Sequence, residues 1–201
     1  MLRWGVGKRG LVTWFYYFVY LALFWSLFRY LVRLPDVIEE LWFKPVIWLV
    51  PLLFVMASMK KKIIVFGNNW KAIPAGILMG LFYFVLFKYR IAPSGTMNID
   101  SVGVAFVTAV VEQITFAGVL LPFLIRESKS ELAGITVTAL AFGLIRIPIN
   151  LFVYGLRPEV FGAVIMLAVG VQLINGFLRV RLNNTWVAIL AHFGLILAGL
   201  S

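Results

Sequence analysis

Residues 101–125 read SVGVAFVTAVVEQITFAGVLLPFLI, an apolar stretch that contains a single charged residue, Glu112. A transmembrane helix needs about 20 consecutive, mostly apolar residues. A charge inside such a helix is costly, so it marks a candidate functional site by default. We therefore expect this stretch to be a membrane helix that carries Glu112 near its middle.

The composition of the whole chain is that of a membrane protein. Of its 201 residues, 63% are hydrophobic and 13% are charged, and the mean hydropathy is +1.00. Soluble domains carry roughly 25% charged residues, and disordered chains combine low hydrophobicity with high charge. These numbers exclude both classes. They predict an all-α, polytopic transmembrane helix bundle that contacts the lipid bilayer.

The chain contains seven candidate membrane spans. They cover residues 11–28, 45–59, 72–87, 101–125, 132–154, 160–178 and 182–200. The first follows a basic segment and lacks a small-residue cleavage site, so we interpret it as an uncleaved signal anchor. The third contains Gly76 and Gly80, a spacing that lets another helix approach closely.

The second candidate span is the least certain of the seven. It is short, and Pro51 interrupts it. The helix could begin near residue 41, with Lys44 extending its ammonium group to the membrane interface. Whether this stretch crosses the bilayer decides the orientation of everything that follows it.

Apart from Arg146, the Lys and Arg residues that give the chain its formal net charge of +10 lie outside the candidate spans. With a cytoplasmic N-terminus, most of these residues fall on the cytoplasmic side, as the positive-inside rule requires. The segment from Lys60 to Lys71 reads KKKIIVFGNNWK, and we expect it to lie along the interface against anionic lipid. These roles account for the basic residues without a nucleic-acid partner. The chain has no cysteine, which excludes disulfides and thiolate ligands.

Each of the last four spans carries polar residues near its middle, whereas the first three carry almost none. This asymmetry divides the chain into apolar helices with a basic interfacial segment, residues 1–100, and a four-helix core around a polar cavity, residues 101–201. Beside Glu112, the residues that we expect at this cavity are Thr108, Thr115, Arg146, Asn150, Gln172, Asn175 and His192. Pro148 should kink the fifth span, and Gln172 and Asn175 suit hydrogen bonds between helices.

A metal or cofactor site is not expected. One histidine and one glutamate are fewer than the three protein ligands that are usual for catalytic zinc.

The order and spacing of these residues resemble the CAAX prenyl endopeptidase and bacteriocin-processing family of intramembrane proteases. That family has two adjacent glutamates, three residues and an arginine on one helix, then phenylalanine-x-x-x-histidine and histidine-x-x-x-asparagine on later helices. The corresponding residues here begin at Glu112, Phe142 and His192. The resemblance covers roughly residues 101–200 and implies a polytopic helical fold and a glutamate-dependent peptidase site.

Four of the six functional positions differ from the family pattern. The first glutamate and the last histidine remain, whereas the other four positions are occupied by Gln113, Ala117, Arg146 and Ile196. The resemblance implies that the first glutamate and first histidine activate water, and that the last histidine and asparagine stabilise the oxyanion. Arginine cannot act as a base, and Ile196 has no donor for an oxyanion.

We therefore expect Glu112 and Arg146 to form a buried structural ion pair where the family has a water site. Three functions remain open. The first is a non-catalytic member that acts as a membrane scaffold, an immunity factor or a subunit binding a membrane protein or peptide. The second is an active, divergent endopeptidase that uses Glu112 and His192. The third is a small transporter or channel, a role that suits intramembrane charges.

Overall fold

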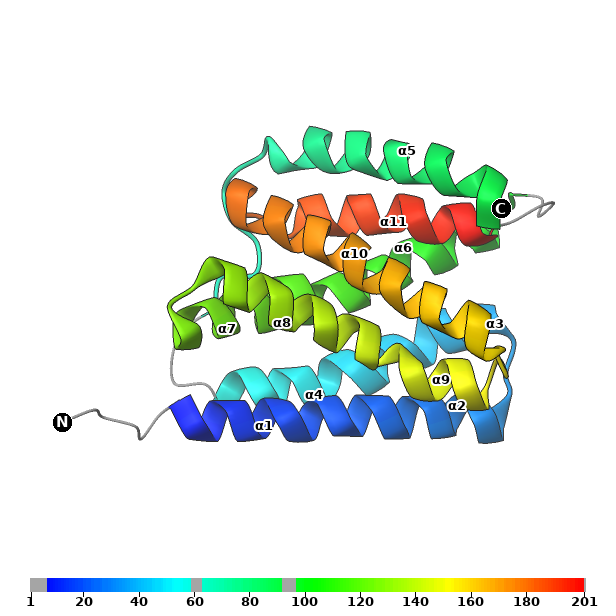
Figure 1. The fold of residues 1–201 in the computed structure, drawn as a ribbon, viewed down its shortest axis with the longest axis horizontal. Helices are drawn as coiled ribbons and strands as arrows, with labels where there is room; N and C mark the ends of the chain where they lie inside the picture. The colour runs from blue at the N-terminus through cyan, green and yellow to red at the C-terminus, as the bar shows by residue number, and fades with distance from the viewer. Residues whose placement is uncertain (1–6, 59–62, 92–96, 201) are drawn as a thin grey trace.

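The computed structural model of the chain describes residues 7–58, 63–91 and 97–200. Its helices run back and forth between the two ends of a bundle (Figure 1). Within the described residues, five helical stretches are long and apolar enough to cross a membrane, and two shorter apolar helices accompany them. The predicted all-α polytopic membrane protein is confirmed.

The N-terminal part contributes three of these helical stretches. The first is formed by α1 (Gly7–Tyr20), the π-helical η1 (Leu21–Trp25) and α2 (Ser26–Val32). The second is formed by α3 (Asp36–Ile38), the π-helical η2 (Glu39–Phe43) and α4 (Lys44–Ser58). The third is α5 (Ala72–Ile91). The C-terminal part contributes the other four. They are α6 (Ile99–Gln113) with the π-helical η3 (Ile114–Leu120) and α7 (Leu121–Ser128), α8 (Glu131–Leu144) with α9 (Arg146–Phe152), α10 (Pro158–Leu182), and α11 (Trp186–Leu200).

The second stretch is longer than its sequence indicates. It begins at Asp36, and Pro51 lies inside α4 without ending it. Proline frees the carbonyl four residues earlier, and in membranes neighbouring groups can satisfy such a carbonyl. Here the hydroxyl of Tyr20 donates to the Ile47 carbonyl at 3.4 Å. The prediction of a short, interrupted second span is therefore wrong.

The glycines of α5 pack against α11, as their spacing predicts. A Cβ atom added to Gly80 would lie 2.4 Å from the carbonyl oxygen of Leu190, and one added to Gly194 would lie 2.0 Å from the carbonyl oxygen of Gly80. These distances leave no room for any side chain. The two helices therefore touch backbone to backbone along the edge of the bundle (Figure 1).

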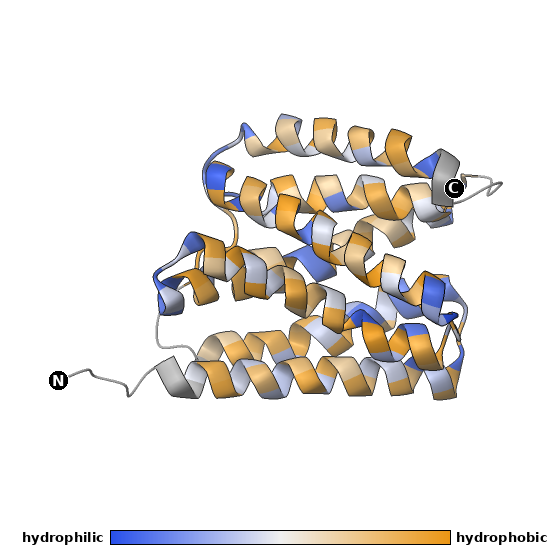
Figure 2. Ribbon diagram, viewed as in Figure 1, coloured by the Kyte–Doolittle hydropathy of each residue, from blue (hydrophilic) through white to orange (hydrophobic). Residues whose placement is uncertain are grey.

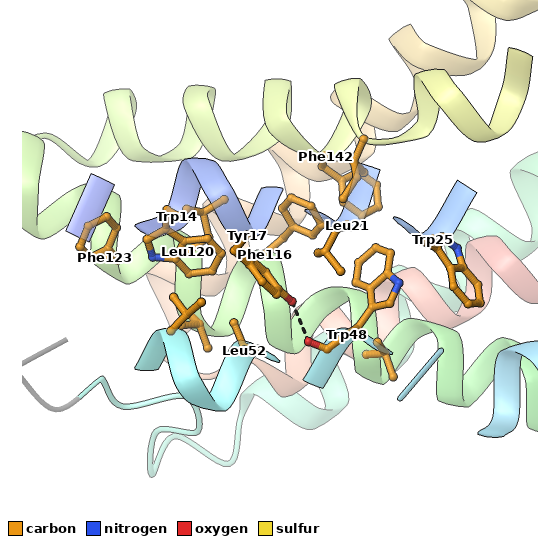
Figure 3. Close-up of a cluster of buried hydrophobic side chains, with 14 of the residues drawn as sticks. Trp14, Tyr17, Leu21, Trp25, Trp48, Leu52, Phe116, Leu120, Phe123 and Phe142 are labelled. Carbon is orange, nitrogen blue, oxygen red and sulfur yellow. Dashed lines mark hydrogen bonds between the residues drawn. The ribbon is translucent and has the colours of Figure 1, made fainter. Parts of the chain in front are cut away.

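Aromatic side chains fill the space between the first two stretches and the C-terminal helices. Figure 3 shows this buried cluster, including Trp14 and Tyr17 from α1, Trp48 from α4 and Phe116 from η3. The Tyr17 hydroxyl donates to the Trp48 carbonyl at 2.8 Å. This cluster joins the N-terminal helices to the core, and it fixes α4 beside α6.

The described part of the predicted interfacial segment is anchored to the turn between α10 and α11. The side-chain amide of Asn184 donates to the Gly67 carbonyl at 2.8 Å, and Phe66 stacks on Trp186. The side-chain oxygen of Asn184 also accepts a hydrogen bond from the backbone N–H of Trp186, the first residue of α11. Lys60 lies outside the described residues, and the contact with anionic lipid stays a prediction.

Hydrophobic residues cover most of the helix lengths, and hydrophilic residues gather at the two ends (Figure 2). The beginning of α1 and the end of α11 lie at opposite ends of the bundle (Figure 1). Hydrophilic positions also occur within the bundle, between α4, α6 and α9 (Figure 2). These interior positions contain the candidate site.

Candidate functional site

Glu112 lies at the centre of a buried group of charged side chains. It occupies the last turn of α6, directly before the π-helical η3, and π-helical turns often mark functional sites. Its Oε1 accepts a hydrogen bond from Nζ of Lys44 at 2.9 Å, and its Oε2 accepts one from Nη2 of Arg146 at 2.7 Å. Nε2 of His192 lies 2.9 Å from the same Oε2. Both oxygens of the carboxylate are thus engaged.

The predicted ion pair between Glu112 and Arg146 is present. The helix of the fifth span breaks at Ile145 and restarts at Arg146, consistent with the missing N–H of Pro148. The guanidinium lies over the ring of Phe142, 4.7 Å from its centroid. At this break in the fifth span α9 begins, and its first residue, Arg146, is directed at the Glu112 carboxylate.

His192 reaches the same carboxylate from α11. Its side chain is buried, and the edge of its ring meets Phe142 with 5.4 Å between centroids. Two motif positions, Arg146 of α9 and His192 of α11, thus contact Glu112 of α6, although the three are far apart in the sequence.

The expectation that Lys44 reaches the membrane interface is wrong. Only 4% of its side chain is exposed, and its Nζ lies 2.7 Å from Glu40 and 2.9 Å from Glu112. Because the helix begins at Asp36, Lys44 lies about two turns inside it rather than at its end. A buried ammonium without a partner would be costly, and here two carboxylates neutralise it.

The charged network continues to one end of the bundle. Glu40 also accepts a hydrogen bond from the hydroxyl of Thr108 at 2.7 Å and lies 3.4 Å from Nη1 of Arg29. Arg29 in turn pairs with Asp36 at 2.6 Å and with Glu39, and it donates to the Tyr154 hydroxyl at 2.8 Å. The charged residues that the N-terminal part contributes to the network therefore lie outside the first three predicted spans, between residues 28 and 45.

A cavity of about 200 Å³ lies beside this network. Its walls include Thr108, Glu112, Arg146, Asn150 and Ile196. Of the eight residues expected at a polar cavity, Thr108, Glu112, Arg146 and Asn150 line this one, whereas Thr115, Gln172, Asn175 and His192 do not. The first two helical stretches complete it with Trp25, Arg29, Asp36, Glu40, Lys44 and Trp48.

The remaining predicted residues lie elsewhere in the bundle. Gln113 donates to the side-chain oxygen of Gln172 at 2.9 Å, so Gln172 joins α10 to α6 as expected. Thr115 donates to the carbonyl of Val111 one turn earlier. Asn175 and Ala117 are fully buried. None of these residues lines the cavity beside Glu112.

Sequence reasoning missed Arg29, Glu39, Glu40 and Lys44 because they lie near the ends of apolar stretches, where charges are ordinary. One signal was available. Glu40 and Lys44 are four residues apart, a spacing that allows an ion pair on one helical face. The sequence alone does not show that the helix face carrying Glu40 and Lys44 is turned toward Glu112.

The site contains four carboxylates, three cations and one imidazole. In the described residues, no group of three His, Cys, Asp or Glu side chains is placed to hold a metal ion. The arrangement can neutralise buried charge and fix five helical segments against one another. It also exposes a donor-rich wall to the cavity.

Comparison with known proteins identifies the C-terminal part of the chain. A family model described as type II CAAX prenyl endopeptidase, Rce1-like, matches residues 95–197. The matched segment includes Glu112, Arg146 and His192, whereas Lys44 lies outside it. No curated protein and no solved structure matches the chain.

Proposed function

Because the chain belongs to the Rce1-like type II CAAX prenyl endopeptidase family, we propose that it is a member that does not cleave peptides. It acts instead as a membrane scaffold, an immunity factor or a subunit that binds a membrane protein or peptide. The observation that carries this proposal is the engagement of both Glu112 oxygens by Lys44, Arg146 and His192.

A general base must accept a proton from water within hydrogen-bond reach. The Glu112 carboxylate is held by two cations and contacts His192, so these three groups occupy most of its roughly four acceptor sites. Arg146 occupies the position at which the family resemblance implies a histidine, and a guanidinium does not deprotonate in proteins. This arrangement favours a structural carboxylate over a catalytic one.

The opposite side of the site supports the same proposal. The family resemblance implies an asparagine that stabilises the oxyanion, and Ile196 occupies that position on the cavity wall. An isoleucine side chain donates no hydrogen bond. Loss of a single oxyanion donor typically lowers the rate by about 10²–10³.

An active, divergent endopeptidase is the second candidate. The contact between Glu112 and His192 at 2.9 Å favours it, since these two family residues remain adjacent and Glu112 borders the cavity. Cleavage would then require a water molecule to bind Glu112 from the cavity beside Lys44 and Arg146.

A proteolysis assay separates the two candidates. The purified full chain is incubated with prenylated CAAX peptides and other membrane peptides, beside Glu112→Ala and His192→Ala. We expect the wild type to release no more product than either variant. Cleavage by the wild type that either variant abolishes would overturn the proposal. A membrane partner that co-purifies equally with wild type and Glu112→Ala would support a scaffold.

We also propose that the N-terminus faces the cytoplasm and that the segment from Lys60 to Lys71 contacts anionic lipid. The turn between α7 and α8 lies at the same end of the bundle as the beginning of α1 (Figure 1). This end carries Arg126, Lys129, Arg179 and Arg181. Such a concentration of basic residues is typical of the cytoplasmic side.

A further inference from the structure

Another cavity, of about 410 Å³, lies at the basic end of the bundle, between α7, the last turn of α10 and the first residue of α8. Its charged and polar wall residues are Arg126, Glu131, Arg179 and Asn183. The rest of its wall is apolar and consists of Ile63, Ile64, Leu121, Pro122, Ile125 and Val180. A wall with one charged part and one apolar part suits an amphiphilic ligand.

Arg126 supplies the donors that a ligand can reach. Its side chain is 30% exposed, and its Nε lies 3.4 Å from an oxygen of Glu127. Its Nη1 and Nη2 donate no hydrogen bond to the described residues, and both atoms are accessible to solvent. The neighbouring Asn183 is exposed, and only its side-chain oxygen is engaged within the same residues. A guanidinium with free N–H groups is suited to bidentate binding of a phosphate.

Arg179 adds a second positive charge to the wall. It is 4% exposed and donates to the hydroxyl of Thr185, the side-chain oxygen of Asn183 and the carbonyl of Ile64. In the part of the chain that the structure describes, no Asp or Glu oxygen lies within 4 Å of its guanidinium nitrogens. Because its acceptors are uncharged, its charge remains and attracts an anion to the cavity.

Glu131 restricts the kind of headgroup that fits. It is exposed, and no cationic nitrogen of the described residues lies within 4 Å of its carboxylate. A ligand with a phosphate alone would place a second negative charge near this carboxylate. A headgroup with an ammonium group beside its phosphate offers a partner both to the arginines and to Glu131.

The chemistry of the wall distinguishes a primary ammonium from a quaternary one. Quaternary ammonium groups are recognised by aromatic cages, and none of the wall residues that the structure describes is aromatic. A primary ammonium donates up to three hydrogen bonds, and the Glu131 carboxylate is an acceptor for them. The wall therefore matches ethanolamine better than choline.

The position of the cavity identifies a membrane lipid as the source of this headgroup. Two candidate membrane spans end here, at Ser128 and Leu182, and another begins at Glu131. Hydrophilic residues gather at this end of the bundle (Figure 2). Lipid headgroups lie at the same level, directly outside the hydrocarbon core. The apolar part of the wall then contacts the acyl chains.

We propose that this cavity binds the headgroup of a diacyl phosphatidylethanolamine, with its phosphate at Arg126 and Asn183 and its ammonium group at Glu131. The proposal goes beyond the function proposed above and beyond the contact of residues 60–71 with anionic lipid. It depends on neither, because the ligand is zwitterionic and its binding is measured without turnover.

Native mass spectrometry of the purified full chain tests the proposal with matched lipids. Dioleoyl phosphatidylethanolamine should bind about two- to fivefold more tightly than dioleoyl phosphatidylcholine, which is the effect of one exposed ion pair. Dioleoyl phosphatidylglycerol, which has a phosphate and no ammonium group, should bind more weakly than phosphatidylethanolamine. Glycerophosphoethanolamine, which lacks the acyl chains, should bind at least about tenfold more weakly because the apolar wall then has no partner.

Two pairs of variants locate the binding site. Arg126→Gln should weaken binding of both zwitterionic lipids about three- to tenfold. Arg181→Gln makes the same change at an exposed cation of the same end that does not border the cavity, and it should leave both affinities unchanged. Glu131→Gln should abolish the preference for ethanolamine over choline. Glu159→Gln, the same change in the first turn of α10, should retain it.

Melting curves in detergent confirm that each variant is folded before binding is compared. Equal affinity for the ethanolamine and choline lipids would overturn the proposal. Tighter binding of phosphatidylglycerol that depends on Arg126 would identify a site for anionic lipid instead. Equal losses from Arg126→Gln and Arg181→Gln would show only a general attraction to the basic end. Glycerophosphoethanolamine binding as tightly as the diacyl lipid would identify a soluble phosphate ester as the ligand.

Discussion

Lys44 and Glu112 form a buried ion pair, with 2.9 Å between Nζ and Oε1, that joins a helix outside the matched family segment to the glutamate inside it. Their side chains are 4% and 6% exposed. The glutamate of the family motif therefore depends on a cation that the motif does not contain. Because of this ion pair, the N-terminal helices are part of the site rather than a separate membrane anchor.

Replacing either member of this pair should destabilise the protein, because the charge of the other member then loses a buried partner. Lys44→Met leaves Glu112 with one cation fewer, and Glu112→Gln leaves Lys44 and Arg146 without their shared partner. Breaking a buried pair from one side costs about 3–5 kcal/mol, which lowers the melting temperature of a chain of this size by roughly 6–20 °C. Thermal unfolding in detergent measures each variant.

The double variant Lys44→Met/Glu112→Gln should lose less than the sum of the two single losses, because neither charge is then left unpaired. A parallel cycle with Glu112→Gln and Arg146→Met should show weaker coupling, since 31% of the Arg146 side chain is exposed. Strictly additive losses in both cycles would show that the contacts contribute nothing to stability.

The contact between α5 and α11 should be intolerant of side chains. Gly80→Leu places a branched side chain where even a Cβ would lie 2.4 Å from the Leu190 carbonyl oxygen. We expect the two helices to separate and the yield of folded protein in membranes to fall several-fold, as for small-residue helix interfaces generally. Gly170→Leu in α10 is the matched control, because a Cβ at Gly170 meets no atom within 4 Å. Equal yields for the two variants would refute the close packing.

The hydrogen bond from Tyr17 to the Trp48 carbonyl should stabilise the proline-containing helix. The carbonyl is buried in the aromatic cluster between α1 and α4 (Figure 3). Tyr17→Phe keeps the ring and leaves this acceptor without its donor, at a cost of about 1–3 kcal/mol. Tyr16→Phe makes the same change on a side chain that is 68% exposed and should leave thermal stability within error. A cost at Tyr16 as large as that at Tyr17 would point to a general effect of the substitution.

The sequence predicts the helices well and the site only in part. Length and hydropathy identify each span, because the bilayer imposes both on any membrane helix. The ion pair of Glu112 with Arg146 follows from the cost of two charges in adjacent spans. Lys44 could not be assigned in this way, since hydropathy does not determine which face of one helix meets another. Its partner depends on aromatic packing between α1, α4 and the core.

Cysteine labelling can determine the orientation of the chain without removing any native residue, because the sequence contains no cysteine. Lys129 lies in the turn between α7 and α8, and Arg157 directly precedes α10 at the opposite end of the bundle (Figure 1). With a cytoplasmic N-terminus, a membrane-impermeant maleimide applied to intact cells should label Arg157→Cys and not Lys129→Cys. Permeabilised cells serve as the control, since both variants should then be labelled. The reverse pattern in intact cells would place the N-terminus outside, and the end of the bundle that carries Arg126, Arg179 and Arg181 would then violate the positive-inside rule.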